Sequence, residues 1–539
     1  MALSEKATQQ IITLLTESLE LQRKGKKGYA NTKIAHDVLS NSKAESTVRR
    51  IKRTLLDSGN YRGYVGQKPI ASGSLTVPKA KRGKFTGKRY VFTSAQNNTF
   101  VHEGFLASLQ TYCEHNCAEL VVSSFHYNKN GFQKGANGEV WFDARVKELL
   151  CDKPMQVAKG LVFCGEFDIL PTAVTPLSGL HNYTSDESAI IPHAKLQMES
   201  VPTPKFDAPK MMYTTGCLTQ MNYKQMKSGI KSEWHHIFAA LVVEIDADGD
   251  WFVRQLTAKS DTGEFYDLDK HYTPCGVTGG HSVEALNYGD IHAAGVDEVV
   301  ADISWRNRDS ILDVLKPKYQ FLSDVMDQKA RNHHNIRDAH FLFKMFNEKT
   351  ESVLDEVVLT ANIIKETLRP FSKTVVVESN HNLAITKWLK EQDYRKDPVN
   401  AIFFLEMQTA IYKSLQKGES LHVFDYACNT YVDGMEDVLF LKEDESFRIA
   451  GNIEAGAHGH LGCNGSRPSM QTYLKLGIKH NLGHVHGAAI REGVFYAGMS
   501  GKLDQKYNKG GSSWNHSHIV TYSNGKRAIV TIKNGKWRG

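Results

Sequence analysis

The stretch LNYGDIHAAG places a carboxylate and an imidazole, Asp290 and His292, two positions apart behind Gly289. Alternate residues of an extended strand point to the same face, so both ionisable groups would face one side. A strand that only joined the core would rarely carry two such groups on one face. Together they can bind a divalent metal ion or move a proton. Because so short a motif also arises by chance, its meaning depends on partners elsewhere in the chain.

Further polar clusters follow apolar runs downstream of this pair. Loops that leave an α/β sheet after its strands deliver side chains to one edge, so such clusters are expected to converge. They lie in the segments QFLSDVMDQ, TVVVESNHN, EAGAHGHLGC and NLGHVHGAA, whose candidate residues are Asp324, Asp327, Asn380, His381, His458, His460, His484 and His486.

The number of candidate ligands is sufficient for two metal ions. Two divalent ions about 3.5–4 Å apart need one bridging carboxylate and several further ligands on each side. A mixture of imidazole, carboxylate and amide oxygen without thiolate suits Mn, Fe or Zn better than Ca or an iron–sulfur centre. One ion would be held by Asp290, His292, Asp324 and His486, and the other by Asp324, Asn380, His458 and His484.

The order of these motifs resembles that of the calcineurin-like metallophosphoesterases, whose signature runs GDxH, GDxxD, GNH, H and GHxH. The match spans Gly289 to His486 in the same order. Ser323 stands where the family has a glycine, and Asn382 stands where an acid follows GNH. Neither change removes a ligand, but the second leaves the orientation of His381 unexplained.

The resemblance implies an α/β fold with a calcineurin-like β-sandwich flanked by helices. It also implies two divalent metal ions, with Mn²⁺ as the first expectation and Mg²⁺, Fe or Zn as alternatives. His458 is preferred over His460 as a ligand, because HGHLGCNGSRPS resembles the tailed-phage branch of the family.

The resemblance further implies how the residues would act. Asp290 and His292 would hold the metal for catalysis, and His381 would stabilise the transition state or protonate the leaving oxygen. A core histidine bonded to the backbone is the alternative for His381. The residues expected behind the ligands or against the substrate are Asp327, His333, His334 and His460.

The charge of the chain is concentrated near its N-terminus. The net charge is +7, and residues 1–90 contain 19 Lys and Arg against 6 Asp and Glu. A basic head on a mildly acidic body favours contact with a polyanion.

Short amphipathic helices with a turn around Asn41–Ser42 predict a helix-turn-helix-like DNA-binding domain over residues 1–68. A helical bundle with a solvated basic surface is the alternative. The DNA-contacting residues would be Arg49, Arg50, Lys52, Arg53, Lys79, Lys81 and Arg82.

The rest of the chain is expected to form a basic linker and one large domain. Residues 69–88 have linker composition, and residues 89–539 would be the metallophosphoesterase domain, with an elaboration around 131–231. Within it, RYVFTSAQN and AELVVSSF predict strands around a helix, and MESVPTPKFDAPKMMYTTG predicts a loop. Residues 306–369 are predicted to be mainly helical. The last segment predicts a hairpin with Asn-Gly turns, and Trp514 is expected in the core rather than as a base-stacking surface.

Composition limits the class of protein. The chain is 41% hydrophobic and 23% charged, as in globular domains. No apolar run approaches the ~20 residues of a membrane helix. The N-terminal MALSEKATQQ lacks a signal-peptide pattern. Eight cysteines without a CxxC pair favour a reducing compartment and no structural zinc.

Longer segments, including FTSAQNNTFVHEGFLASLQTYCEHNCAELVV and SSWNHSHIVTYSNGKRAIVTIKNGKW, resemble large metallophosphoesterases of tailed phages. That resemblance implies a metal-dependent DNase in the cytoplasm of the infected bacterium, which degrades host DNA early in infection and supports phage DNA transfer. DNA is the expected partner, a homo-oligomer is compatible with the sequence, and no membrane segment is expected. The alternatives are an enzyme of small phosphoesters or phosphoproteins, and a DNA-binding regulator with an inactive phosphoesterase scaffold.

Overall fold

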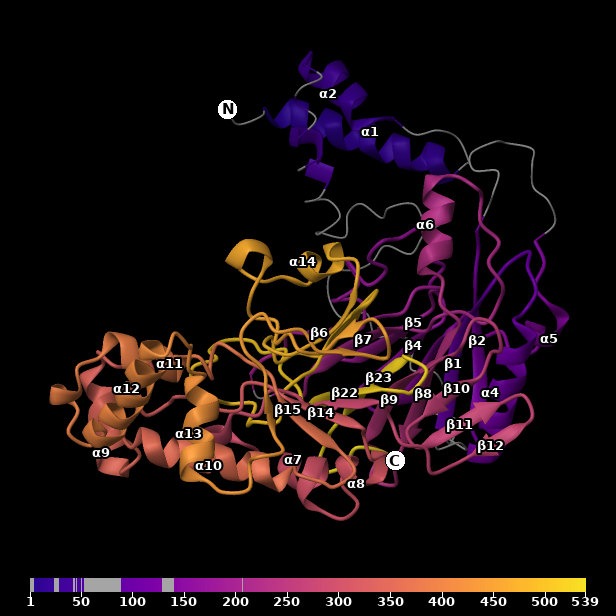
Figure 1. Ribbon diagram of the computed structural model, residues 1–539. Helices are drawn as coiled ribbons and strands as arrows, with labels where there is room; N and C mark the ends of the chain where they lie inside the picture. The colour runs from indigo at the N-terminus through magenta and orange to yellow at the C-terminus, as the bar shows by residue number, and fades with distance from the viewer. Residues whose placement is uncertain are drawn as a thin grey trace. The chain divides into compact units, whose positions relative to one another are not determined.

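The computed structural model describes residues 4–23, 29–41, 44, 46–49, 51–52, 89–127, 140–205 and 207–539. The chain divides into two compact units, Met1–Thr76 and Val77–Gly539. Figure 1 labels their helices and many of their strands. Among the described residues, no helix is both long enough and apolar enough to cross a membrane.

The first unit is helical where it is described. It contains α1 (Glu5–Arg23) and α2 (Asn31–Leu39), and residues 46–49 and 51–52 are also in helical conformation. Helices are thus present where the sequence predicts them, whereas the helix-turn-helix assignment stays a prediction. A small apolar cluster holds these helices together: Ile11, Leu15, Ile34, Ala35 and Val48.

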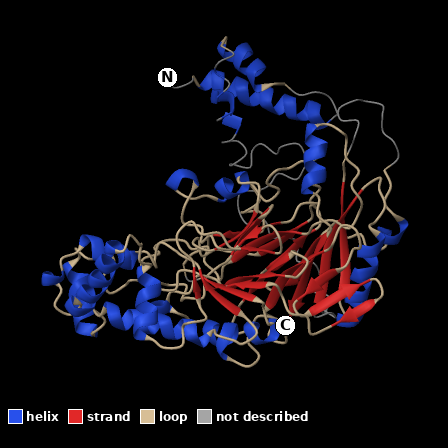
Figure 2. Ribbon diagram, viewed as in Figure 1, coloured by secondary structure: helices blue, strands red, loops and turns tan. Residues whose placement is uncertain are grey.

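The second unit is a mixed α/β structure, which confirms the predicted fold class at this level. Its described strands form four sheets, gathered in the middle of the unit in Figure 2. In spatial order, the six-stranded sheet is β16 (Leu439–Phe440), β15 (Lys373–Val376), β14 (Tyr319–Leu322), β13 (Ala285–Asn287), β22 (Ser517–Thr521) and β23 (Arg527–Thr531). The four-stranded sheet is β2 (Glu119–Phe125), β1 (Arg89–Gln96), β8 (Ala239–Ile245) and β9 (Trp251–Thr257). The three-stranded sheet is β10 (Phe265–Asp267), β11 (Lys270–Thr273) and β12 (Gly276–Thr278).

The largest sheet of the described residues has ten strands and combines segments far apart in the sequence. Strands from 154–214 pair with strands from 448–496 through β6 and β20, which are antiparallel. In spatial order the sheet is β17 (Arg448–Ile449), β18 (Ile453–Glu454), β19 (Lys479–Leu482), β21 (Val494–Tyr496), β20 (Ala489–Arg491), β6 (Gln197–Val201), β7 (Lys210–Thr214), β5 (Ser188–Ile191), β4 (Leu161–Cys164) and β3 (Pro154–Ala158).

The six-stranded sheet is covered on both faces. On one face, Ala285, Phe321 and Val375 share a buried cluster with Ile449 and Ile453 of the ten-stranded sheet. Alternate strand residues point to opposite sides, so the next residue of each strand faces the helices. The cluster on that side includes Leu286, Leu322, Val376, Ile363 and Trp388. The two large sheets therefore face each other, with helices on the outer side of the smaller one.

Helices surround the sheets of the second unit, and many of them gather at one side in Figures 1 and 2. They are α4 (Glu103–Asn116), α5 (Ala144–Lys147), α6 (Lys227–His235), α7 (Glu298–Ala301), α8 (Ile311–Leu315), α9 (Ala339–Glu348), α10 (Val353–Glu366), α11 (Ala384–Glu391), α12 (Ala401–Gln416), α13 (Val423–Tyr431) and α14 (Met470–Lys475).

Several predicted elements are confirmed. β1 and β2 are parallel neighbours joined by α4, which is the predicted strand–helix–strand unit. β22 and β23 form the predicted terminal hairpin. Beyond it, Asn534 and Gly535 have φ angles of 49° and 75°, the positive values that an Asn-Gly turn requires.

One prediction of local structure is wrong. The stretch MESVPTPKFDAPKMMYTTG, predicted as a loop, contains most of β6 and all of β7, which pair with each other in the ten-stranded sheet. Its prolines and methionines give no clear strand pattern, and β6 and β7 are stabilised by pairing with β20 and β5 as well as with each other. The stretch 306–369 contains α8, α9 and α10, which confirms that it is mainly helical, but the prediction missed the short strand β14. Strands of four or five residues are too short for periodicity to separate them from helix.

Arg254 on β9 is the charged centre of the four-stranded sheet. Its guanidinium donates twice to Asp267 at 2.8 Å and once to Glu244 at 2.5 Å, and all three side chains are buried. We expect Arg254→Ala to lower the free energy of unfolding by about 3–5 kcal/mol, because it leaves buried carboxylates without their cation. Urea unfolding measures this loss.

The exposed pair of Arg395 with Asp393, at 2.9 Å, provides the matched control. We expect Arg395→Ala to unfold at the same urea concentration as the wild type, because solvent screens an exposed pair. An Arg254→Ala protein as stable as this control would contradict the structural role of the buried cation.

Candidate metal centre

Candidate residues lie on loops that leave the six-stranded sheet at one edge. β13, β14 and β15 are parallel neighbours, so their carboxyl ends meet there. Asp290 and His292 follow β13, Asp324 follows β14, and His381 follows β15. The first two loops stay paired beyond the strands, because the His292 amide donates to the Asp324 carbonyl at 2.8 Å. Motifs that are distant in the sequence are thereby neighbours in space.

The other candidate histidines come from the ten-stranded sheet. His458 follows β18, and His484 and His486 follow β19, which is parallel to β18. The Gly483 amide donates to the His458 carbonyl at 2.8 Å. The His484 amide donates to Asp290 Oδ2 at 2.6 Å, which connects the loops of the two sheets directly.

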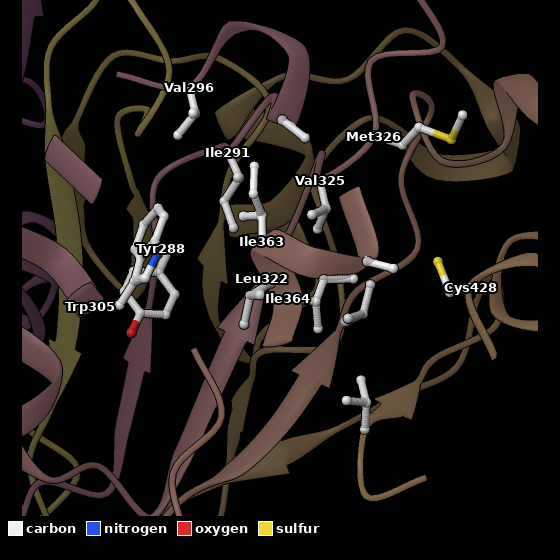
Figure 3. Packing of buried hydrophobic residues seen from close by; sticks show 14 of the residues in the cluster. Tyr288, Ile291, Val296, Trp305, Leu322, Val325, Met326, Ile363, Ile364 and Cys428 are labelled. Carbon is white, nitrogen blue, oxygen red and sulfur yellow. The ribbon is translucent and has the colours of Figure 1, made fainter. Parts of the chain in front are cut away.

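Buried apolar side chains anchor the loops of the six-stranded sheet. Ile291, between the two polar residues of the first motif, is fully buried in the cluster beneath the helices. Val325 and Met326, directly after Asp324, are fully buried in the same cluster, and Figure 3 shows all three apolar residues. Burying such a side chain stabilises the fold by about 1.5–3 kcal/mol. In each of these loops, buried apolar residues next to the polar residues in the sequence therefore hold the polar residues in place.

Four candidate ligands have left-handed backbone conformations. Their φ angles are 52° at His292, 45° at Asp324, 73° at His484 and 57° at His486. Each such residue costs on the order of 1 kcal/mol relative to a right-handed or extended one. A concentration of strained residues that the surrounding packing maintains is typical of a functional site.

One group of side chains, which we call site 1, comprises Asp290, His292, Asp324 and His486. All four are buried, and their ligand atoms lie within 4.8 Å of one another. His486 Nε2 is 3.1 Å from Asp290 Oδ2 and 3.1 Å from His292 Nε2. Two imidazole nitrogens at this separation fit neighbouring positions around one ion, since metal–nitrogen bonds are ~2.0–2.1 Å long.

A second group, which we call site 2, comprises Asp324, His458 and His484. Their ligand atoms also lie within 4.8 Å of one another, and His458 Nε2 is 3.2 Å from Asp324 Oδ2. Asp324 therefore belongs to both groups. His460 lies outside both, with its ring centroid 5.5 Å from that of His458. Asn380 is exposed on the turn after β15, and its role as a ligand stays a prediction.

Several polar atoms of this region are buried without a hydrogen-bond partner among the described residues. They include Asp324 Oδ1 and both ring nitrogens of His458, whose approach to Asp324 lacks hydrogen-bond geometry. A buried polar atom without a partner costs about 1–3 kcal/mol. One nitrogen of a neutral imidazole carries a lone pair, and a lone pair beside a carboxylate oxygen fits a cation as the common partner of both atoms. The residues present therefore fit a bound metal ion.

A third cluster joins His292 to Asp327 and His381. Asp327 Oδ1 is 2.6 Å from His292 Nδ1, so the carboxylate orients this ring and leaves Nε2 for site 1. The His381 ring packs edge-on to that of His292, with centroids 4.8 Å apart, and its side chain is 22% exposed. Asn382 Oδ1 accepts a hydrogen bond from the Met326 amide at 3.2 Å. Asn382 thus joins two loops, and His381 borders the site on its accessible side.

The charges of the cluster favour ionised carboxylates. Burial opposes ionisation of Asp290 and Asp324, but nearby His458 in particular lowers the pKa of both carboxyl groups. Burial likewise disfavours a charged His292, yet the Asp327 carboxylate raises the pKa of this imidazole to about 9. Anionic carboxylates are the form that binds a metal ion. Strong mutual perturbation of this kind is typical of functional sites.

Other predicted residues belong to neither site 1 nor site 2. His333 and His334 are exposed beyond the Asp327 loop, with ring centroids 3.9 Å apart. Arg49 and Lys52 belong to the first unit, and their contact with DNA stays a prediction. The other predicted DNA-contacting residues lie outside the described residues: Arg50, Arg53, Lys79, Lys81 and Arg82.

Two supporting residues were not predicted. The Ser323 hydroxyl donates to Asp290 Oδ1 at 2.9 Å, although the sequence marks Ser323 only as a departure from the family glycine. Gly483 approaches the same carboxylate so closely that a Cβ there would lie 2.2 Å from Oδ1. The sequence could have indicated Gly483, because it directly precedes His484, where the family signature GHxH also has a glycine.

The fold and the site define a mixed α/β protein with a buried cluster of carboxylates and imidazoles that could hold a metal ion. The chain is 43% identical over 483 residues to Protein A1 of Escherichia phage T5, covering 87% of this chain and 86% of that protein. It therefore belongs to the family of this phage protein. No family model and no solved structure matches the chain. The relationship to calcineurin-like metallophosphoesterases accordingly stays a hypothesis from the motifs.

Replacing Gly483 with alanine tests the close contact between the loops. Asp290 would have to move, because the new Cβ would lie 2.2 Å from its Oδ1. We expect the affinity for Mn²⁺ to fall by about 10–100-fold, as when the support of a metal ligand is disturbed. Isothermal titration calorimetry measures the affinity. Gly279→Ala is the matched control, since a Cβ there meets only Lys270 Cγ at 4.0 Å. Equal affinities of the two variants would contradict the close packing at Asp290.

Proposed function

We propose that the protein is a two-metal phosphodiesterase of the calcineurin-like type that cleaves DNA. The observation that carries the proposal is the buried Asp324 carboxylate shared by site 1 and site 2. Two-metal phosphoesterases clamp a phosphoryl group between ions about 3.5–4 Å apart, which requires such a bridging ligand. The facing sheets with helices outside one of them agree with a calcineurin-like fold. In the Protein A1 family, this activity would degrade host DNA early in infection and support phage DNA transfer.

The two sites would each hold one divalent ion. Their ligands contain imidazole and carboxylate but no thiolate, which suits Mn²⁺ first, with Mg²⁺, Fe or Zn as alternatives. When bound, the ions would supply Lewis acidity toward phosphoryl oxygens and promote the ionisation of water. Site 1 would use Asp290, His292, Asp324 and His486, and site 2 would use Asp324, His458 and His484 with the predicted ligand Asn380.

The protein's own groups would orient the site and move the proton. Asp327 would keep the Nδ1 proton of His292 between the two side chains, 2.6 Å apart, so that Nε2 keeps its lone pair. His381 belongs to neither site 1 nor site 2; it forms a third group with His292 and Asp327, and it is partly accessible. Its Nδ1 faces the Asp327 carbonyl oxygen at 3.4 Å, which leaves Nε2 for the substrate. With Nδ1–H directed at that carbonyl, Nε2 carries a proton only when the ring is an imidazolium, and this form would pass its Nε2 proton to the leaving 3′ or 5′ oxygen and remain as the neutral imidazole.

The basic N-terminal region would supply much of the attraction for DNA. Residues 1–90 carry 19 Lys and Arg against 6 acidic residues, in a chain whose net charge is only +7. Such a segment gains affinity for DNA by displacing counterions from phosphates, without reading sequence. This charge favours DNA over a small phosphoester as the substrate.

Two substitutions separate metal binding from proton transfer. We expect Asp324→Asn to abolish Mn²⁺-dependent cleavage of linear DNA and to reduce the bound metal, because both sites lose their shared charge. We expect His381→Ala to keep its metal but to lower kcat by about 10²–10⁴-fold, the loss typical of a missing general acid. Gel assays with Mn²⁺, Mg²⁺ or EDTA, together with elemental analysis, measure both. His340→Ala, an exposed histidine on α9, is the matched control.

Three outcomes would contradict the nuclease proposal. Normal DNA cleavage by Asp324→Asn would place the chemistry elsewhere. Hydrolysis of a p-nitrophenyl phosphate ester with intact DNA would favour an enzyme of small phosphoesters. Purified protein that binds no divalent transition metal would favour a regulator with an inactive scaffold.

The salt dependence of DNA binding tests the basic region. Each phosphate contact contributes about 0.9 to the slope of log affinity against log salt concentration. We therefore expect Arg49→Ala with Lys52→Ala to weaken DNA binding and to reduce this slope by about 2. Fluorescence anisotropy with duplex DNA in EDTA measures the slope. Lys413→Ala with Lys417→Ala removes the same charge from the exposed surface of the second unit. Identical slopes for both double variants would contradict DNA contact through the first unit.

A further inference from the structure

An aromatic pair beside site 1 has no part in the reaction described above. Tyr507 and Trp514 lie between β21 and β22, with ring centroids 5.7 Å apart and planes inclined at 65°. Trp514 in turn packs edge-on against His486, with centroids 4.3 Å apart. Trp514, expected in the core, is half-buried, and Tyr507 is 56% exposed. A row of rings thus runs from a site 1 residue to the protein surface.

The segment that carries these rings is fixed at both ends. The Lys502 amide donates to the Gly295 carbonyl at 2.8 Å, three residues after His292. At the other end, Ser512 and Thr203 exchange amide–carbonyl hydrogen bonds of 2.8 and 3.0 Å. Tyr507 is therefore presented by a loop anchored next to site 1. Such anchoring reduces the entropy lost when a ligand binds to the ring.

The electrostatics of Tyr507 also place it near the candidate ligands. Desolvation, followed by the charges of Asp327, Asp324 and Asp290, raises the pKa of its hydroxyl group. These carboxylates act on the phenol only because they lie close to it. The ring therefore stays uncharged at neutral pH and does not repel a phosphate at the adjacent site.

We infer that Tyr507, supported by Trp514, is a stacking surface for a nucleobase next to the phosphate bound at sites 1 and 2. An exposed ring beside a centre for phosphate fits a ligand that joins a flat π-face to a phosphodiester, as a nucleotide does. A base within an intact duplex cannot present its face, so the base would come from a strand end, a single strand or a flipped nucleotide. The inference rests on the proposed function and adds a preference for phosphodiesters with an unpaired neighbouring base.

Strands that lack one base test this inference. A single-stranded oligonucleotide with one tetrahydrofuran abasic residue is compared with the intact strand, and cleavage is mapped at both phosphodiesters beside that residue. For the wild type with Mn²⁺, we expect kcat/KM at one of these bonds to fall by about 10-fold, within the range for loss of one stacked base. Tyr507→Ala should cleave both strands at the same reduced rate, and Tyr507→Phe should behave as the wild type. Tyr412→Ala, which removes a tyrosine that is 67% exposed on α12, is the matched control.

The outcomes distinguish this inference from the proposed function. Equal cleavage of both strands by the wild type would overturn the inference alone, because the nuclease would still be active. Unchanged discrimination by Tyr507→Ala would overturn it as well, as would loss of Mn²⁺ from that variant, which would assign the ring to support of His486. Absence of any DNA cleavage by the metal-loaded wild type would overturn the proposed function and this inference with it.

Discussion

The hydrogen bond from the His484 amide to Asp290 is the contact on which the candidate metal centre depends. It joins a loop of the ten-stranded sheet to a loop of the six-stranded sheet, and each loop alone holds only part of the ligand set. The two loops are so close at this contact that residue 483 has no space for a side chain, because a Cβ there would lie 2.2 Å from the Asp290 carboxylate. Site 1 and site 2 each combine residues from loops of both sheets, so both sites depend on this contact.

Without bound metal, the candidate metal centre reduces the stability of the folded protein. His292, Asp324, His484 and His486 have left-handed backbones, and Asp324 Oδ1 is buried without a hydrogen-bond partner among the described residues. Packing of apolar neighbours such as Ile291 offsets part of this cost on the helix side of the sheet. A ligand that binds only the folded state stabilises it further, so metal binding and stability are expected to be linked. Several left-handed residues gathered in one place are typical of a preorganised functional site.

The sequence predicts this architecture unevenly. The order of the polar motifs after apolar runs predicts candidate ligands from the sequence alone, because the ends of the strands are where functional side chains of an α/β fold lie together. These candidates include Asp290, His292, Asp324, His458 and His486. Short strands such as β6 and β7 are missed, since part of their stability comes from pairing with β20 and β5, which no local pattern shows. The stacking position of Tyr507 leaves no pattern in the sequence, because only the folded loop brings it beside the carboxylates. The helices of the first unit are predicted from the helical spacing of their apolar residues. That spacing does not indicate what the helices bind.

The central claim is that two ions share Asp324, and electron paramagnetic resonance of the Mn²⁺-loaded full-length protein tests it most directly. Two Mn²⁺ ions about 3.5–4 Å apart across one carboxylate are spin-coupled. The account therefore predicts two Mn²⁺ per chain and a coupled spectrum that Asp324→Asn removes. One Mn²⁺ per chain with the six-line spectrum of an isolated ion, or a coupled spectrum unchanged by Asp324→Asn, would contradict it.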